Sequence, residues 1–263
     1  MARAVGVGGA AHRLAARAAG AGDGGGIVAV GRACRSWSRL VDCGVVQTLA
    51  VLASGQGTNF EALVLAERRG ELGGRIVALL SDDPQAPVLE RARRLGVETV
   101  LPPAGRFRTR LEDERPWRDA LAARGVEVVL LAGFMRRLHA TLLDAFPDRI
   151  LNLHPSLLPA FPGLDPIGQA WAHGVRVTGC TVHLVDDTLD AGPILGQSVV
   201  EVREDDTLAA LTGRIHAAEH RLYPAVVARY LAGHWRRDGR RLVPVAAPVP
   251  PAAGVAGRER SRP

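Results

Sequence analysis

Residues 48–59 read Thr-Leu-Ala-Val-Leu-Ala-Ser-Gly-Gln-Gly-Thr-Asn. The first six residues form a short and almost wholly apolar run, which is typical of a strand buried on both faces of a sheet. A glycine-containing turn follows, and a helical pattern begins at Asn59. Because strand, tight turn and helix in this order begin a βαβ unit, the stretch predicts a parallel sheet with helices packed on its faces.

The same alternation continues along the chain. The predicted strands are Thr48–Ala53, Arg75–Ser81, Glu98–Leu101, Val126–Ala132, Arg149–Leu153, Val175–Val185 and Leu195–Val202. The predicted helices are Asn59–Arg69, Pro87–Leu95, Pro116–Arg124, His139–Ala145 and a long closing helix at Leu208–Leu231. The expected fold class is therefore α/β, a Rossmann-like, mostly parallel sheet flanked by helices, with an antiparallel C-terminal portion.

The two ends of the chain differ from its body. Residues 1–44 are rich in Ala, Gly and Arg, which predicts a disordered extension, or a translation start assigned too early. Residues 245–263 are dominated by Pro, Ala and Arg and predict a second disordered tail. We therefore expect one folded domain at 45–244. The three widely spaced cysteines of the whole chain form no CxxC pair, which favours a cytoplasmic protein.

The positive charge also lies in the ends. The formal net charge is +6, but residues 1–46 hold six Arg against two Asp, and residues 234–263 hold seven Arg against one Asp and one Glu. Subtracting the charges of these two ends, +4 and +5, from the total leaves about −3 for residues 47–233. A mildly acidic body argues against a nucleic-acid partner. The apolar runs stop well short of the roughly 18 residues that a membrane span needs, so no membrane segment and no obligate protein partner are expected.

The turn after the first strand is a candidate anion site. Ser54-Gly55-Gln56-Gly57-Thr58-Asn59 opens a helix, where free backbone amides and the helix dipole favour an anion. All 33 basic residues are Arg, which excludes a P-loop lysine and a lysine Schiff base. The alternative is a tight turn in which the side chain of Thr58 or Asn59 caps the helix.

A candidate acid–base centre follows the fifth predicted strand. Two residues apart in an extended segment, Asn152 and His154 project from the same face. An amide that donates to a carbonyl oxygen beside an imidazole that transfers protons suits acyl transfer. Asp190, in a later acidic loop, is the candidate partner that favours the protonated imidazole. The alternatives are a capping Asn, a core His, and a surface turn in which Asp186 and Asp187 are equally exposed.

Three stretches together resemble the phosphoribosylglycinamide formyltransferase family, the folate-dependent glycinamide ribonucleotide transformylases of purine synthesis. They read Leu-Ala-Gly-Phe-Met-Arg at 131–136, Asn-Leu-His-Pro-Ser-Leu-Leu-Pro-Ala-Phe-Pro-Gly at 152–163, and Asp-Ala-Gly-Pro-Ile at 190–194. They occur in the same order as in the family, and the resemblance covers nearly all of residues 47–244.

The resemblance implies direct transfer of a formyl group from 10-formyltetrahydrofolate to the glycinamide amine, through a tetrahedral intermediate and without a metal. Asn152 and protonated His154 would stabilise its oxygen, and Asp190 would keep His154 charged. By the same likeness, the ribonucleotide phosphate would be bound by Gly57, Thr58 and Asn59, and its ribose by Glu219. The folate pocket would be lined by Met135, Arg136, Arg137 and Leu138, with Arg110 and Asn152 also in contact.

Other members of the wider group are alternatives. A methionyl-tRNA formyltransferase is expected to carry a further C-terminal domain, and a formyltetrahydrofolate hydrolase a further N-terminal one. A non-catalytic module that binds folate or nucleotide is the alternative of another class. His183 stands in an alternating strand pattern before the acidic loop. A supporting role near the site and a buried structural role are equally open for it, so it is left outside the expected catalytic set.

Overall fold

The computed structural model describes residues 46–233 and 235–244. All of these residues belong to one compact unit. The predictions for residues 1–44 and 245–263 thus fall outside the described residues.

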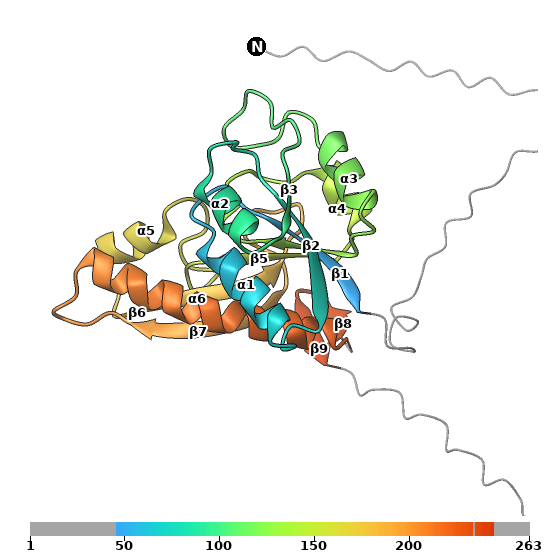
Figure 1. Cartoon of the computed structure of the whole chain (residues 1–263). Coiled ribbons are helices and arrows are strands. Elements are labelled where there is room, and N and C mark those ends of the chain that lie inside the picture. Colours follow the sequence, from blue (N-terminus) through green and yellow to red (C-terminus); the bar gives the residue numbers. More distant parts are fainter. Residues whose placement is uncertain (1–45, 234, 245–263) are drawn as a thin grey trace, which may run out of the picture. The chain divides into compact units, whose positions relative to one another are not determined.

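The described strands form a nine-stranded sheet in the order β3-β2-β1-β4-β5-β6-β7-β9-β8 (Figure 1). The strands are β1 (Gln47–Leu52), β2 (Gly74–Leu80), β3 (Glu98–Val100), β4 (Val128–Leu131), β5 (Ile150–His154), β6 (Val177–Leu184), β7 (Ile194–Glu201), β8 (Trp235–Asp238) and β9 (Arg241–Pro244). The helices are α1 (Thr58–Arg68), α2 (Pro87–Arg94), α3 (Arg115–Ala122), α4 (Ala140–Ala145), α5 (Pro166–Ala172) and α6 (Leu208–Leu231).

The pairing confirms the predicted fold class. The first five strands pair in parallel, and β5 with β6, β6 with β7, and β8 with β9 pair antiparallel. Two elements were not predicted. One is α5, whose start is capped by the Asp165 side chain as it accepts from the backbone N–H of Gly168. The other is the β8–β9 hairpin, which extends the sheet beyond β7.

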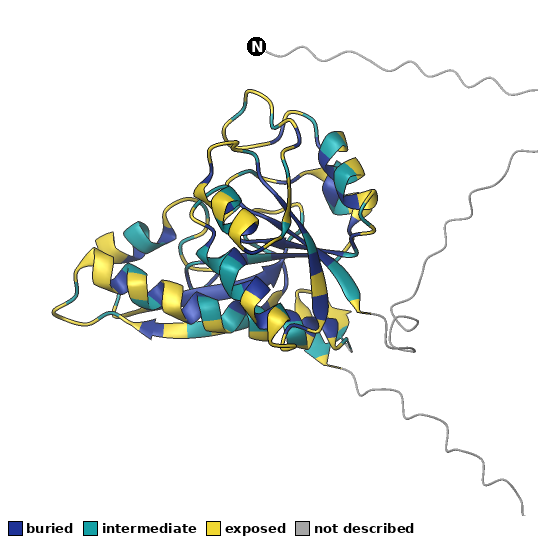
Figure 2. Ribbon diagram, in the orientation of Figure 1, coloured by how far each residue is buried: buried dark blue, intermediate teal, exposed yellow. Residues whose placement is uncertain are grey.

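Alternate residues of the parallel strands enter different cores. In β1, Leu49 and Val51 belong to one buried cluster, together with residues of α1, α2 and α6. Ala50 and Leu52 belong to a second cluster, with residues of α3 and α4. The helices therefore cover both faces, with their buried sides on the sheet and exposed sides outward (Figure 2). No helix among the described residues is long and apolar enough to cross a lipid bilayer.

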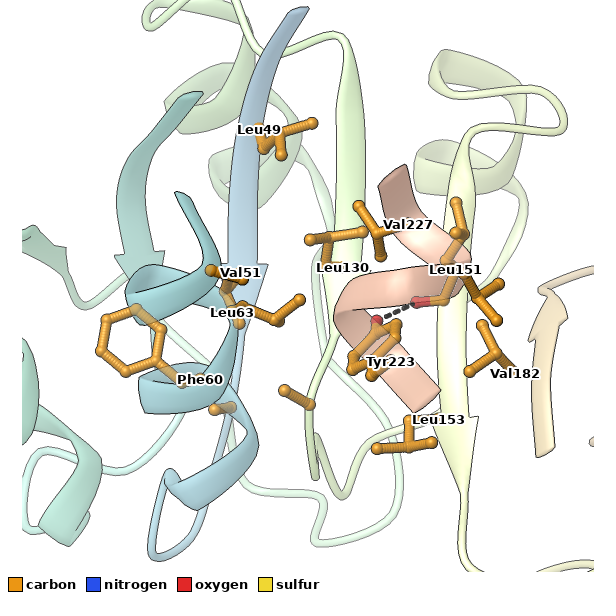
Figure 3. Packing of buried hydrophobic residues seen from close by; sticks show 14 of the residues in the cluster. Leu49, Val51, Phe60, Leu63, Leu130, Leu151, Leu153, Val182, Tyr223 and Val227 are labelled. Carbon is orange, nitrogen blue, oxygen red and sulfur yellow. Dashed lines mark hydrogen bonds between the residues drawn. The ribbon is translucent and has the colours of Figure 1, made fainter. Parts of the chain in front are cut away.

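Tyr223 ties the long helix to the centre of the sheet. Its side chain is fully buried in α6, and its hydroxyl lies 3.0 Å from the carbonyl oxygen of Leu151 (Figure 3). The hydroxyl also lies 3.0 Å from the carbonyl oxygen of Leu131. These carbonyls belong to the neighbouring strands β4 and β5. The hydroxyl thus fixes α6 against β5, which carries Asn152 and His154, and against β4, which leads into the predicted folate residues.

We predict that Tyr223→Phe destabilises the fold, because a buried carbonyl loses its donor while the ring still fills the core. The expected cost is about 1–2 kcal/mol, measured from urea unfolding with an unchanged m value. Thr212→Val is the control, since the Thr212 hydroxyl bonds only to a carbonyl of its own helix. Equal stability of Tyr223→Phe and the wild-type chain would contradict this role.

Candidate active site

The glycine loop leaves the start of α1 open to an anion. Gly57 is the N-cap of α1 with φ 74°, and no side chain caps the helix, so the alternative of a Thr58 or Asn59 cap is not realised. A Cβ on Gly57 would lie 2.3 Å from a Val88 methyl carbon, so only glycine fits. The loop is held by α2, through Val88 N–H to the Gly55 carbonyl and Arg91 Nε–H to the Gln56 carbonyl.

Asn59 joins this loop to α6. Its Nδ2 donates to Glu219 Oε2 at 2.8 Å, so the structure brings Glu219 next to Gly57, Thr58 and Asn59. Glu219 is 3% exposed, and burial raises the pKa of its carboxyl, while the bond from Asn59 acts in the opposite direction. Among the described residues, the buried Asn59 Oδ1 has no hydrogen-bond partner.

The antiparallel pairing of β5 with β6 assembles the acid–base centre. Asn152 lies opposite His183, and His154 lies opposite Thr181. Asn152 Nδ2 and His183 Nε2 are 3.1 Å apart. His183 therefore contacts a member of the predicted catalytic set, and sequence reasoning had left it outside that set.

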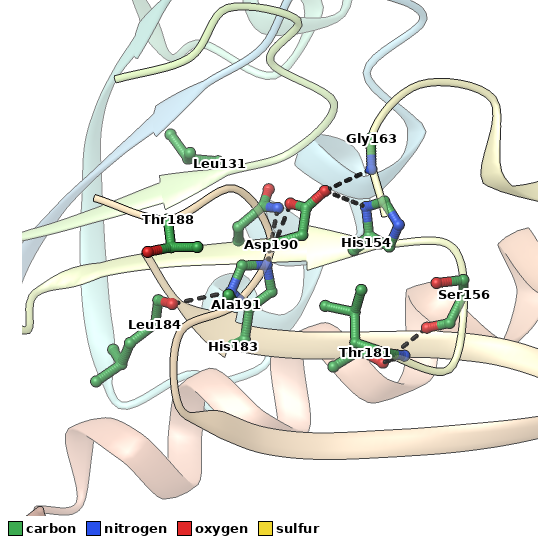
Figure 4. Close-up of polar contacts among 12 residues, drawn as sticks. Leu131, His154, Ser156, Gly163, Thr181, His183, Leu184, Thr188, Asp190 and Ala191 are labelled. Carbon is green, nitrogen blue, oxygen red and sulfur yellow. Dashed lines mark hydrogen bonds and ion pairs between the residues drawn. The ribbon is translucent and has the colours of Figure 1, made fainter. Parts of the chain in front are cut away.

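Asp190 lies between the two imidazoles (Figure 4). Its Oδ2 is 3.6 Å from His154 Nδ1, and its Oδ1 is 3.7 Å from His183 Nε2. Oδ2 also accepts from the backbone N–H of Gly163 at 2.8 Å. Asp190, whose side chain is 9% exposed, is thus a partner of His154, unlike the exposed Asp187 of the same loop.

The backbone of the Asp190 loop folds back tightly over β6. Asp190 has φ 50°, in the left-handed region, where Asp is among the more tolerant residues. A Cβ on Gly192 would lie 1.9 Å from the Leu184 carbonyl oxygen, so this return requires glycine. These two residues bring the carboxylate back over the strand that it has just left.

The hydrogen bonds of His183 fix its tautomer. Its Nδ1 lies 2.8 Å from the Leu184 carbonyl oxygen, which can only accept, so Nδ1 carries the proton. Burial lowers the pKa of His183, and this outweighs the opposing influences of the Leu184 bond and of Asp190. The ring is thus neutral near pH 7, its Nε2 is an acceptor, and the amide of Asn152 donates to it.

His154 has protein partners at both ring nitrogens. Nδ1 faces Asp190, and Nε2 lies 2.9 Å from the Phe161 carbonyl oxygen. Because a carbonyl only accepts, Nε2 carries a proton. The ring is 5% exposed. Nε2 can donate its proton to another group only after its hydrogen bond to the Phe161 carbonyl has broken.

Most of the predicted folate residues lie in Leu131–Leu138, a segment beside this centre that we call the folate wall. Leu131 pairs with Asn152, so the chain that continues from β4 into residues 132–138 starts next to the catalytic amide. Met135 is 56% exposed and Leu138 is buried. Arg110 and Arg137 pair across a β-bridge, and Arg137 donates to the Asp187 carbonyl. Arg136 differs from them, since Asp82 holds its guanidinium.

Asp190 also borders a cavity of about 540 Å³. The other walls are Leu158, Pro159, Gly192, Ile194, Arg240, Arg241 and Leu242. Arg240 at the hairpin donates to the Ala191 carbonyl, which ties β8–β9 to the Asp190 loop. Within residues 46–233 and 235–244, no cluster of three or more His, Cys, Asp or Glu could hold a metal ion.

Comparisons with known proteins find similar sequences and similar structures. The family profile described as formyl transferase matches residues 47–227. Phosphoribosylglycinamide formyltransferase of Bacillus subtilis is 41% identical over 186 residues, which cover 71% of this chain and 95% of that protein. The crystal structure of glycinamide ribonucleotide transformylase 1 from Symbiobacterium toebii superposes with a TM-score of 0.74 at 44% identity, covering 78% of this chain and 96% of the other.

A formyltetrahydrofolate deformylase from Pseudomonas syringae shares the fold, with a TM-score of 0.69. The two chains are 23% identical over 77% of this chain and 67% of the deformylase. At this identity the likeness shows the fold alone.

We predict that His183 in the folded protein is the Nδ1-protonated neutral tautomer and titrates below the ordinary value of 6.5. Two-bond ¹⁵N–¹H NMR spectra of histidine-labelled protein measure both, with His183→Gln to assign the signal. Because the unfolded chain takes up a proton near pH 6.5 and the folded ring resists it, this group makes stability fall as pH drops below 6.5. An Nε2-protonated ring, or a midpoint above 6.5, would contradict the prediction.

Proposed function

The chain belongs to the formyl transferase family and is a phosphoribosylglycinamide formyltransferase of purine biosynthesis, and we propose that it transfers the formyl group of 10-formyltetrahydrofolate directly to the amine of 5-phosphoribosylglycinamide. One observation carries the proposal. Asn152, His154 and Asp190 converge with a neutral His183 beside the Leu131–Leu138 wall and near the strand ends that carry the glycine loop. This set supplies a donor to a carbonyl oxygen and a mobile proton, which are the two requirements of acyl transfer.

Asn152 would stabilise the oxygen of the tetrahedral intermediate. One hydrogen of its amide goes to His183 Nε2, which leaves the second for the formyl oxygen. Because His183 is neutral and accepts, the amide presents its NH₂ rather than its carbonyl. A donor that is partly shielded from water and oriented in advance toward a developing oxyanion stabilises it more than water would.

His154 would carry the proton. The amine nitrogen would first bond to the formyl carbon and give the tetrahedral intermediate. The carbon–N10 bond of the folate would then break, and over the two steps the amine loses a proton and N10 gains one. Asp190 Oδ2 lies 3.6 Å from Nδ1, so the carboxylate would orient a proton that the ring carries on this nitrogen. Release of the Phe161 carbonyl then frees Nε2–H for the substrate.

Direct transfer also fits the state of the buried thiol. Burial raises the pKa of Cys180 to about 12, so this cysteine remains a thiol near neutral pH and supplies no thiolate for a covalent step.

The ribonucleotide would lie between α1 and α6. Its phosphate would bind the open amides of Gly57, Thr58 and Asn59, where the helix dipole favours an anion. The ribose hydroxyls would donate to Glu219, and a hydroxyl in this position can also donate to the unpaired Asn59 Oδ1. A buried polar atom without a partner is costly, and the substrate would satisfy it.

The folate would lie against residues 135–138. The exposed Arg110 and Arg137 are the cations placed to meet its carboxylates, and Asn152 the group nearest to its formyl oxygen. Hydrolysis of the same donor by water is the competing reaction, because it uses the same centre. The open N-terminus of α1 and the Asn59–Glu219 contact favour transfer to a phosphorylated amine instead.

The test is turnover by the purified chain with both substrates. We expect formylation of the glycinamide ribonucleotide, a loss in kcat of about 10²–10³-fold for Asn152→Leu, and a loss of about 10²–10⁴-fold for His154→Gln. His139→Gln, at an exposed histidine, is the matched control. Formation of formate and tetrahydrofolate at the same rate without the ribonucleotide would identify a hydrolase. Binding of both substrates without product would identify a binding module.

Glu219→Gln should stabilise the folded protein and weaken its binding of the ribonucleotide. The folded carboxyl has a raised pKa, so its ionisation makes the wild type lose stability as pH rises from about 4.5, and glutamine removes this loss while still accepting from Asn59. At pH 7.5 we expect the Tm to rise by roughly 2–4 °C for each kcal/mol by which the free energy of unfolding increases. This rise in Tm should become smaller as the pH approaches 4.5.

The same variant should raise the KM for the ribonucleotide by about 10-fold and leave the KM for the folate unchanged, because a ribose hydroxyl bonds more strongly to a carboxylate than to an amide. Glu201→Gln, at an exposed position of β7, is the control for charge. A lower Tm at pH 7.5, or an unchanged KM, would contradict the assignment of Glu219.

A further inference from the structure

Asp82 makes two short contacts at the end of β2 that the proposed mechanism does not use. Its Oδ1 accepts from the Ser54 hydroxyl at 2.5 Å, and its Oδ2 lies 2.5 Å from Arg136 Nε. The side chains of Asp82 and Arg136 are 8% and 12% exposed. The other ion pairs with an arginine have at least one partner exposed by a quarter or more, among the described residues.

The two partners of Asp82 belong to different substrate subsites. Ser54 begins the glycine loop, and Arg136 lies in the folate wall. Ser54 also contacts that wall directly, since its N–H donates to the Gly133 carbonyl and its Oγ accepts from Met135 N–H, each at 3.1 Å. Arg136 donates in turn to the Arg110 carbonyl at 3.2 Å. A continuous set of hydrogen bonds therefore joins the glycine loop, the wall and the Arg110 segment through one carboxylate.

We propose that Asp82 is a positioning residue that couples the phosphate loop to the folate wall, so that binding of either substrate favours binding of the other. The proposal takes the identity of the two substrates from the proposed function. Ordering one loop fixes Ser54, and Ser54 holds Asp82 and Met135. Asp82 then fixes the guanidinium of Arg136. The second substrate therefore meets a wall that is already ordered and loses less conformational entropy on binding.

The charges support coupling rather than direct recognition by Arg136. The Asp82 carboxylate balances the guanidinium of Arg136 at short range, so this arginine has little positive charge to offer a folate carboxylate. The exposed Arg110 and Arg137 keep that task, and Arg136 sets the position of Arg110 through its carbonyl. Removing the Asp82 charge would leave the guanidinium of Arg136, which is 12% exposed, without a negative partner. A charge so little exposed to water is costly without such a partner.

The experiment compares Asp82→Asn with the wild type. We expect the KM of both substrates to rise by about 5–20-fold, within the usual range of coupling between sites, while kcat changes by less than about threefold and its pH profile is unchanged. Asparagine retains an oxygen for the Ser54 hydroxyl but loses the charge that holds Arg136.

Calorimetry then measures the coupling itself without turnover. The Kd of the ribonucleotide is measured alone and with saturating tetrahydrofolate, the product that carries no formyl group. We expect tetrahydrofolate to tighten ribonucleotide binding by about fivefold or more in the wild type and to have almost no effect in Asp82→Asn. Arg136→Gln should lose the same coupling, and the double variant should lose little more.

The matched control is Asp206→Asn. Asp206 also pairs with an arginine, Arg214, and its side chain is 4% exposed, but the pair lies at the start of α6 and touches neither loop. Its KM values and its coupling should match the wild type. Should Asp82→Asn fail to fold, Ser54→Ala breaks the same set of bonds at its other end and should lose the coupling.

Two results would overturn the inference while leaving the proposed function intact. One is unchanged KM values and coupling in Asp82→Asn, with or without a lower Tm, which would make the pair merely structural. The other is a fall in kcat alone, which would place Asp82 in the chemical step. A wild-type chain that turns over neither substrate would instead overturn the proposed function.

Discussion

The site depends on the antiparallel pairing of β5 with β6. A sixth parallel strand would have carried its residues in the same direction as Asn152 and His154, with a long connection to follow. The antiparallel strand places His183 opposite Asn152, and its loop returns at once over the same residues. The return is tight enough that Gly192 has no room for a Cβ against the Leu184 carbonyl oxygen. The reversal of direction thus delivers the Asp190 carboxylate to the end of β5.

The two imidazoles that contact this carboxylate have different roles, and burial of His183 is the cause. His183 and His154 lie at 3.7 Å and 3.6 Å from the two oxygens of Asp190. Two imidazolium ions so close together would repel each other in a buried site. Desolvation lowers the pKa of His183, and its Nδ1–H is taken by the Leu184 carbonyl. Asp190 therefore acts as the partner of His154, while the neutral His183 orients the amide of Asn152.

Local patterns in the sequence were sufficient for the fold class, because β1, β2, β4 and β5 are short, mostly apolar runs and helices separate the successive strands. They also placed Asn152 and His154 on one face, since side chains alternate along any strand. The role of His183 could not be read in this way, because it depends on which residue of β5 lies opposite. The missed elements had local signals, namely Asp165-Pro166 before α5 and the Asp238-Gly239 turn of the hairpin. The Asp82–Arg136 pair had none, since 54 residues separate its partners.

The position of the site follows from the strand order. The chain runs from β1 outward to β3, then crosses to β4 on the other side of β1, so the loops after β1 and β4 diverge at the point where the strand order reverses. The glycine loop follows β1, and the Leu131–Leu138 wall begins at the end of β4. Loops that diverge share few contacts by default, yet two substrates must meet within bonding distance for a direct transfer. The contacts of Ser54 and Asp82 with residues 133–136 join the two loops and would thereby set the alignment of the two subsites.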